Sequence, residues 1–305
     1  MVVLCVCMAQ PFRIMSYNVE NLFDTIDNPL TADDEFVPQS DRHWDTYRYW
    51  HKMQKLSEVI VNVGEWYHAA IVGLIEVEDS TCLRDLCRRS ALRTLGYRYI
   101  HYESQDVRGI DVAMLYDPNQ FRPLVHYPLV IDFGYETRPT RDLLYVKGLM
   151  PNNDTLHLMV CHAPSQLGGT DAKQKRRFVL NRINQFADSL LTIDPMARIV
   201  LMGDFNDNPK RVSPYIPTLQ NMMELPIDSL IAFPNMAKGT YVYQELWSLL
   251  DQFFVSQSLS DVVKAQIYNP DRLIKNGKPH RTYTFIRYDR TGFSDHLPIY
   301  LDIPL

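Results

Sequence analysis

Short clusters of polar and charged residues follow the apolar segments of this chain, one after another. They contain side chains that can bind cations or transfer protons: Asn18, Glu20, Glu76, His162, Asp204, Asn206, Asp251, Asp295 and His296. Rigid scaffolds commonly carry their active sites on loops at the ends of such segments. The set is poor in cysteine and rich in carboxylates and amides, which are the ligand types that magnesium prefers. Together the clusters predict an active site that uses a hard divalent cation.

Several candidates also have an ordinary structural interpretation. Glu76 interrupts an apolar run, and a single Glu there is usually capped or ion-paired at a strand end. His162 follows a core-like segment, where a lone His is more often structural, but Pro164-Ser165 and Gly168-Gly169 after it indicate a functional loop. For Arg108 the alternatives stay open, because an Arg can hold a phosphate through two hydrogen bonds or can simply be solvated.

The elements that must position these clusters are mostly β-strands. Stretches rich in β-branched or aromatic residues predict strands at 12–17, 70–75, 97–101, 111–116, 144–149, 155–161, 198–202, 248–255 and 297–303. Helices are predicted at 47–63 and after Gly168-Gly169, the second capped by Thr170 or Asp171. Many strands with few helices between them favour two mixed sheets packed face to face between helical layers, an α/β/β/α arrangement.

Composition excludes some classes of protein. Of the 305 residues, 46% are apolar and 22% are charged, which is enough apolar material for a large core and argues against disorder. The net charge is -5, so no global positive field draws the chain onto nucleic acid or anionic lipid. No linker or repeat interrupts residues 11–305, so we expect a single domain there. No stretch of these residues approaches the roughly 18 uninterrupted apolar residues of a membrane-spanning helix, so we expect no stable membrane insertion. The protein is expected to be a monomer.

The first ten residues form a short apolar run that ends at small and polar residues. The run resembles the back half of a secretory signal peptide without its basic start, which a misplaced start codon would explain. We therefore expect an exported protein, periplasmic or extracellular, with a plain first strand and a cytoplasmic location as the alternative. The five cysteines match neither a zinc pattern nor a disulfide framework, and Cys82, Cys87 and Cys161 are predicted to be small buried side chains.

The order and types of the clustered polar residues resemble those of the endonuclease/exonuclease/phosphatase superfamily, whose fold is that of deoxyribonuclease I. The most specific motifs are Gly203-Asp204-Phe205-Asn206 and Ser294-Asp295-His296, supported in the same order by Asn18, Glu76 and Asp251. The resemblance covers nearly the whole chain. It implies a four-layered α/β/β/α sandwich and a metal-dependent hydrolase that cuts an ester bond of phosphate with activated water.

The resemblance also implies which residues hold the metal ion. Glu76 would be the principal ligand, with Asn18, Glu20 and Asp295 close to the ion or its waters. The ion would be Mg2+, with Mn2+ or Ca2+ as alternatives.

The remaining motif residues would act on the substrate. Asp204 and Asn206 would orient the attacking water and the phosphate. His296 would contact the scissile phosphate while Asp251 fixes its ring, so that the carboxylate raises the basicity of the imidazole. His162 would assist phosphate binding or protonate the leaving group. The predicted substrate-binding residues are Asn18, Asn206, His162 and Arg108.

The motifs predict the type of reaction but not the substrate. The family contains nucleases, lipid phosphodiesterases and inositol-phosphate phosphatases. The acidic balance and the loop Asp33-Asp34-Glu35 favour a small-molecule or general phosphoesterase over a DNA or RNA nuclease, which stays the alternative. A degenerate phosphate-binding module is the non-enzymatic alternative. Every motif position is filled, which argues against it.

Overall fold

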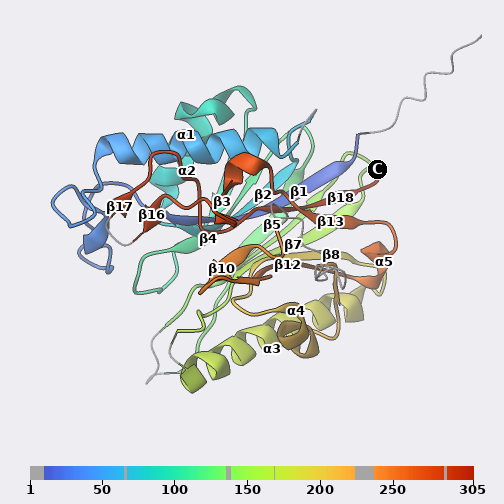
Figure 1. The fold of residues 1–305 in the computed structure, drawn as a ribbon. Helices are drawn as coiled ribbons and strands as arrows, with labels where there is room; N and C mark the ends of the chain where they lie inside the picture. The colour runs from blue at the N-terminus through green and yellow to red at the C-terminus, as the bar shows by residue number, and fades with distance from the viewer. Residues whose placement is uncertain (1–9, 65–66, 135–138, 168, 224–236, 285–286) are drawn as a thin grey trace, which may run out of the picture.

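The computed structural model of the chain describes residues 10–64, 67–134, 139–167, 169–223, 237–284 and 287–305. Two six-stranded sheets lie face to face, and helices cover the outer face of each sheet (Figure 1). The predicted four-layered α/β/β/α sandwich is therefore confirmed. The predicted signal-peptide remnant lies almost entirely outside the described residues.

The first sheet has the strand order β13-β18-β1-β2-β4-β3, and its central pair, β1 and β2, is parallel. All other neighbours in it are antiparallel, including the predicted adjacent pair β3 and β4. Its strands are β1 (Phe12–Leu22), β2 (Ile71–Val77), β3 (Arg98–His101), β4 (Asp111–Tyr116), β13 (Lys264–Ile267) and β18 (Ile299–Ile303).

The second sheet repeats this plan, with the order β5-β6-β7-β8-β12-β9 and a central parallel pair, β7 and β8. Its strands are β5 (Arg122–Leu129), β6 (Leu143–Leu149), β7 (Thr155–His162), β8 (Arg198–Asp204), β9 (Gln220–Asn221) and β12 (Asp251–Val255). Three two-stranded sheets complete the β-structure of the described chain: β10 (Tyr241–Tyr243) with β11 (Leu246–Ser248), β14 (Ile274–Lys275) with β15 (Lys278–Pro279), and β16 (Tyr283–Thr284) with β17 (Arg287–Tyr288).

The main core lies between the two sheets, and both faces of the central strands are buried. In β1, Phe12 and Ile14 belong to the core between the sheets, whereas Met15 and Tyr17 face the helices. Successive side chains of a strand point to opposite faces, so a strand in a middle layer must be apolar on both. This explains why these strands read as nearly continuous apolar runs.

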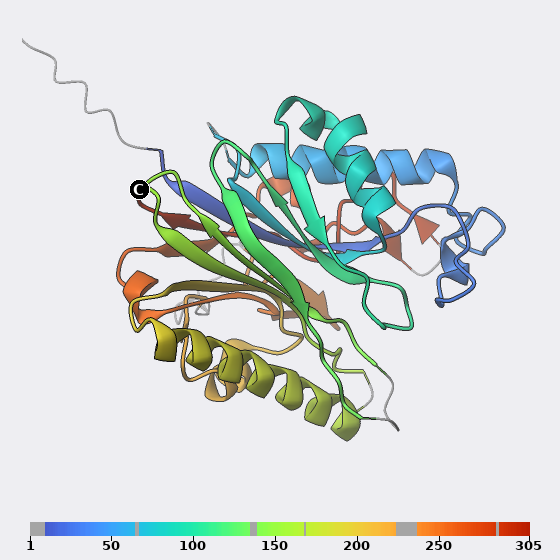
Figure 2. The ribbon, with the colours of Figure 1, turned by 180° about the vertical axis from the view of Figure 1, so that it is seen from behind.

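Helices form the two outer layers, as both views of the ribbon show (Figures 1 and 2). Helices α1 (Thr46–Asn62) and α2 (Ser80–Arg89) pack on the first sheet, and α3 (Gly169–Ile193) packs on the second. Short helices follow β8 and β12: α4 (Pro209–Val212) with the 3-10 turn η3 (Ser213–Tyr215), and α5 (Gln257–Ser260). The other 3-10 turns are η1 (Asp34–Phe36), η2 (Ala91–Thr94) and η4 (Asp271–Leu273). None of the helices in the described chain is long and apolar enough to cross a membrane.

Two details differ from the sequence prediction. Helix α3 begins at Gly169, so Thr170 and Asp171 lie inside it and neither is its cap. The predicted strand at 248–255 is divided into β11 and β12, because the chain leaves the hairpin before it enters the second sheet at Asp251. The helix at 47–63 is confirmed within one residue at each end, with Asp45 accepting a hydrogen bond from the backbone N of Arg48 as its cap.

Candidate active site

The ends of the two parallel strand pairs bring four predicted site residues together. Asn18 and Glu76 lie at the C-terminal ends of β1 and β2, and His162 and Asp204 end β7 and β8. Asn18 Nδ2 donates to Asp204 Oδ2 at 3.1 Å. His162 Nε2 lies 3.8 Å from Glu76 Oε1 and 3.8 Å from Asp204 Oδ2. The cluster therefore joins the two sheets at one edge of the sandwich.

Backbone irregularities direct these side chains. Glu20, Asn21, Glu76 and Asn206 all have positive φ angles, between 51° and 68°. The register shifts between Asn18 and Leu22 and again beside Glu76, as in a β-bulge. Such conformations are uncommon for residues other than glycine and concentrate at functional sites. Here they turn the Glu76 carboxylate toward β1, where Oε2 accepts from the backbone N of Asn21 at 2.9 Å.

Asp251 and His296 reach the cluster from antiparallel neighbours. Asp251 stands opposite Asp204 in the register of β12 and β8, and His296 lies just before β18. His296 Nδ1 is 2.7 Å from Asp251 Oδ2, and its Nε2 is 3.9 Å from Asp204 Oδ2. Ser294 holds the loop, since its Oγ donates to the carbonyl of Asn18 and accepts from the backbone N of His296. The predicted orientation of the His296 ring by Asp251 is present in this geometry.

The two histidines differ in their electrostatic surroundings. Burial favours neutral His296, but the Asp251 carboxylate and its hydrogen bond outweigh burial and hold the pKa of His296 well above its usual value. Burial lowers the pKa of His162 well below its usual value, and Arg141 and Arg108 act in the same direction. The cluster thus pairs one imidazolium with one neutral imidazole. Groups whose pKa values are pushed apart in this way suit acid and base roles.

Asp204 lies between these histidines. It is buried, and burial raises its pKa to about 7 even though the charge of His296 opposes that shift. Its Oδ1 accepts from the backbone N of Asn206 at 2.8 Å, and Asn206 Nδ2 donates to the carbonyl of Ala163 at 2.9 Å. Gly203 before it has φ of 143°, and a Cβ there would stand 1.9 Å from the carbonyl oxygen of Cys161. Only glycine allows this turn.

Glu20 and Asp295 form a neighbouring group around a residue that sequence reasoning missed. Arg281 Nη2 lies 2.8 Å from Glu20 Oε1 and 3.3 Å from Asp295 Oδ2. Burial, and then the charge of Asp295, raise the pKa of Glu20, while Arg281 and Lys52 act against this. Because Glu20 is engaged by a guanidinium, its role as a metal ligand stays a prediction, as does that of Asp295.

Lys52 and Tyr241 were also missed. Lys52 is buried on the face of α1 that carries Tyr49 and Met53, and a lysine within an apolar helical stripe was a signal that could have identified it. The ring of Tyr241 lies 4.8 Å from that of His296. No sequence pattern marks Tyr241, since its place depends on the hairpin that crosses the site.

Arg108 lies apart from the cluster, on the side of His162. Its side chain is 44% exposed, and its Nε is 3.7 Å from Asp106 Oδ1. It lines a pocket of about 450 Å³ together with Arg141, which donates to Asp106 at 3.0 Å. The structure therefore places Arg108 beside the site rather than within the group of contacts around Asp204.

The donor set suits a hard cation. The carboxylates of Asp204, which is buried, and Glu76, which is half-buried, both lie 3.8 Å from His162 Nε2, and carboxylate oxygens are ligands that a hard cation prefers. The amide oxygen of Asn18 accepts from the backbone N of Glu20 at 3.0 Å. Within the described residues, the groups of three or more His, Cys, Asp or Glu whose ligand atoms all lie within 4.8 Å of one another are Glu78 with Asp79 and Cys82, and His101 with Glu103 and Asp111. Neither contains the predicted metal ligands.

Glu78, two residues beyond Glu76, allows a test of burial in this region. Burial raises the pKa of Glu78 from 4.5 to about 8, and Asp24, Asp79 and Asp33 add to the shift. Because the pKa of Glu78 is higher in the folded than in the unfolded protein, its contribution to the free energy of unfolding is complete below pH 4.5. This contribution is lost as pH rises toward 8. Glu78→Gln should therefore raise the unfolding temperature relative to wild type more at pH 9 than at pH 5, as measured by calorimetry. An equal difference at both values would contradict the buried, neutral carboxyl.

A comparison with protein families decides the class of the chain. The sequence model of the "Endonuclease/Exonuclease/phosphatase family" matches residues 13–304. The chain belongs to this family. The resemblance found in its motifs is thereby confirmed, and the protein is a hydrolytic enzyme of the phosphoesterase and nuclease class. A comparison with curated proteins finds no match.

Solved structures share the fold of this family member at low sequence identity. Truncated TDP2 from Caenorhabditis elegans is 16% identical with a TM-score of 0.65, over 98% of this chain and 99% of that one. A mannosyl-6-phosphatase from Bacteroides thetaiotaomicron VPI-5482 is 15% identical with a TM-score of 0.60, over 96% and 100%. D. rerio TDP2, complexed with single strand DNA product, is 17% identical with a TM-score of 0.59, over 96% and 98%. At these identities the likeness shows the fold alone.

Proposed function

We propose that this protein is a divalent-metal-dependent phosphoesterase that hydrolyses a phosphodiester or phosphomonoester through an activated water. The observation that carries the proposal is the buried chain of contacts from Asp251 through His296 to Asp204. Asn18 joins it from β1 of the first sheet, and His162 joins it from β7, the parallel neighbour of β8. A phosphate ester repels nucleophiles through its own charge, so its hydrolysis needs positive charge, a positioned water and a route for protons.

The side chains of the cluster can supply a route for protons and part of the positive charge. Asp204 lies where it can accept a proton from the attacking water, and its raised pKa suits that task near neutral pH. His296, held by Asp251, places a charged imidazolium against the phosphate. His162 and the amides of Asn18 and Asn206 would bind the phosphate oxygens, with Arg108 at the rim.

Glu76 and Asn18 are the residues that we propose to hold the metal ion, with Glu20 and Asp295 close to it or its waters. When bound, the cation neutralises phosphate charge as a Lewis acid. Mg2+ is the expected ion, with Mn2+ or Ca2+ as alternatives. The buried amine of Lys52, whose pKa burial lowers, and the guanidinium of Arg281 would limit the negative charge that remains around this position.

The substrate is proposed only by class. A small-molecule or general phosphate ester is preferred, and a nucleic acid cut by a nuclease activity is the alternative. The single domain over residues 11–305, the export and the monomeric state stay predictions from the sequence.

Hydrolysis of a chromogenic phosphodiester and of a chromogenic phosphomonoester tests this function. We expect turnover with added Mg2+, Mn2+ or Ca2+, loss of turnover on chelation with EDTA, and recovery when the ion is restored. Release of product that is unaffected by EDTA would argue against metal dependence. The absence of turnover with all three ions would remove the catalytic proposal.

A further inference from the structure

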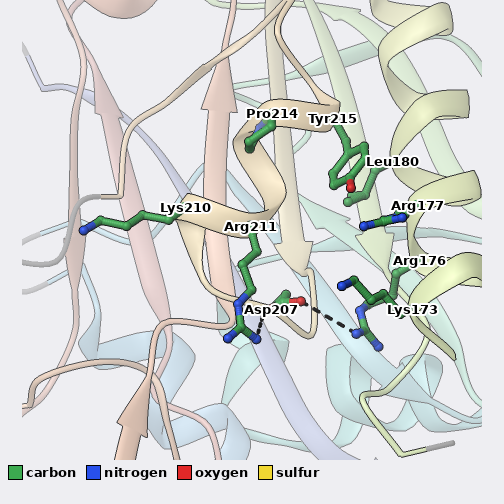
Figure 3. Close-up of a pocket in the computed structure, with 9 residues that line it drawn as sticks. All are labelled: Lys173, Arg176, Arg177, Leu180, Asp207, Lys210, Arg211, Pro214 and Tyr215. Carbon is green, nitrogen blue, oxygen red and sulfur yellow. Dashed lines mark hydrogen bonds and ion pairs between the residues drawn. The ribbon is translucent and has the colours of Figure 1, made fainter. Parts of the chain in front are cut away.

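A basic groove lies between α3 and the segment after β8 (Figure 3). The basic groove is a cavity of about 430 Å³. Five cationic side chains line it: Lys173, Arg176, Arg177, Lys210 and Arg211. Asp207 is the acidic residue among those that line it. The net charge of the whole chain is -5, so the groove concentrates positive charge on an acidic protein. Such local fields attract anions.

Arg176 connects this groove to the loops that carry the catalytic residues. It is buried, and its Nη1 donates to the carbonyl of Ser165 at 2.8 Å, in the loop that follows His162. Its Nη2 lies 3.6 Å from Oδ2 of Asp207, the residue that directly follows Asn206 in the sequence. The same arginine thus contacts both loops that reach the cluster, and the groove that it lines adjoins the loop after Asn206 through Asp207.

Asp207 is the carboxylate that pairs with two of the cations, Arg176 and Arg211. Arg211 is 71% exposed and lies 3.4 Å from the Asp207 carboxylate that Arg176 also approaches. Arg177 lies over the ring of Tyr215 at 5.4 Å. Within the described residues, Lys173 makes no hydrogen bond or ion pair, and it stands four positions before Arg177 on α3. Like charges four positions apart on a helix repel each other, and an anion bound beside them would relieve this repulsion.

We propose that the basic groove binds a second phosphate group of the substrate, one that is not hydrolysed. The inference rests on the proposed function of the catalytic cluster and narrows its substrate to esters with more than one phosphate. Guanidinium groups bind phosphate oxygens through paired hydrogen bonds, and lysine adds a mobile charge. A strand of nucleic acid and a small multiply phosphorylated molecule share this chemistry.

Direct binding tests the groove separately from catalysis. A His296→Gln background is used without added metal, so that nothing is consumed, and the probes are inorganic tripolyphosphate and a labelled single-stranded oligonucleotide. The double variant Lys173→Gln/Arg211→Gln neutralises one cation on α3 and one on α4. It should weaken the binding of both probes about tenfold at low salt. For the oligonucleotide, the slope of log affinity against log salt should fall by about 1.4.

The matched control removes the same net charge elsewhere. Arg122→Gln/Lys264→Gln changes two exposed cations on the edge strands β5 and β13. It should leave both affinities and the unfolding temperature unchanged. A loss for both probes supports a general second-phosphate site, and a loss for the oligonucleotide alone assigns the second phosphate to a strand. No loss for either probe, or an equal loss in the control, would overturn the proposal.

Kinetics separate this proposal from the proposed function. In a chain with His296 intact, the groove variant should lower kcat/KM about tenfold more for a multiply phosphorylated substrate than for a chromogenic ester with one phosphate. An equal effect on both substrates would overturn the second-phosphate site. Failure of the wild-type protein to hydrolyse any ester would instead remove the proposed function, while the binding measurement still reports on the groove.

Discussion

A His296→Gln variant is expected to keep the fold and to lose about 10²- to 10⁴-fold in kcat. Glutamine can still reach Asp251 through a hydrogen bond, but it carries no charge and transfers no proton. In the wild-type protein His296 is charged, because Asp251 holds its pKa well above the usual value. The measurement is kcat on a chromogenic phosphodiester at saturating metal, with the unfolding temperature as the check on folding.

Asp251→Asn tests whether the two residues act as one unit. The carboxylate is fully buried and contacts Nδ1 of His296 at 2.7 Å, so its loss should lower kcat nearly as much as the loss of the imidazole. Residues that act together show losses that do not add. The double variant should therefore be close to His296→Gln alone. A double variant whose loss equals the product of the two single losses would contradict a shared role.

Glu76→Gln is expected to lower the affinity for the metal ion at least about 100-fold, because a neutral amide replaces the principal carboxylate ligand. The amide oxygen can still accept the hydrogen bond from the backbone of Asn21, so the turn of β2 should survive. Isothermal titration with Mn2+ or Mg2+ measures the affinity, and the metal dependence of kcat gives a second measure.

Glu78→Gln is the matched control for this experiment, since it makes the same change two residues further along the chain. Glu78 accepts from the backbone N of Asp24 at 2.6 Å and lies outside the group of contacts around Asp204. Its variant should bind metal and turn over substrate like wild type. If both variants lost metal affinity equally, the change would reflect the acidity of the region rather than a ligand role of Glu76.

Much of the fold followed from local patterns, and the exceptions have physical causes. Strand β5 was not predicted, because Pro123 and Pro128 argue against a strand interior and most of its side chains are exposed. Both features are tolerated because β5 is an edge strand of the second sheet. The break between β11 and β12 was missed because Leu249 and Leu250 continue the apolar run through it. Periodicity alone cannot locate such a break.

The supporting residues around the site were the least predictable. Arg281 contacts Glu20 across 261 positions of sequence, and the ring of Tyr241 approaches His296 from a hairpin. An arginine or tyrosine in a polar loop has many ordinary explanations, and its partner is chosen only when distant segments pack together.

The sequence by itself determined the types of the main strands, their two buried faces and the polar residues at their ends, because these depend on near neighbours in the chain. Only the tertiary structure decided that Asn18 meets Asp204 across 186 positions, that His296 lies between Asp251 and Asp204, and that a basic groove adjoins them. The physical reason is that apolar burial between the sheets, rather than any local preference, brings the ends of the two parallel strand pairs to the same edge of the sandwich.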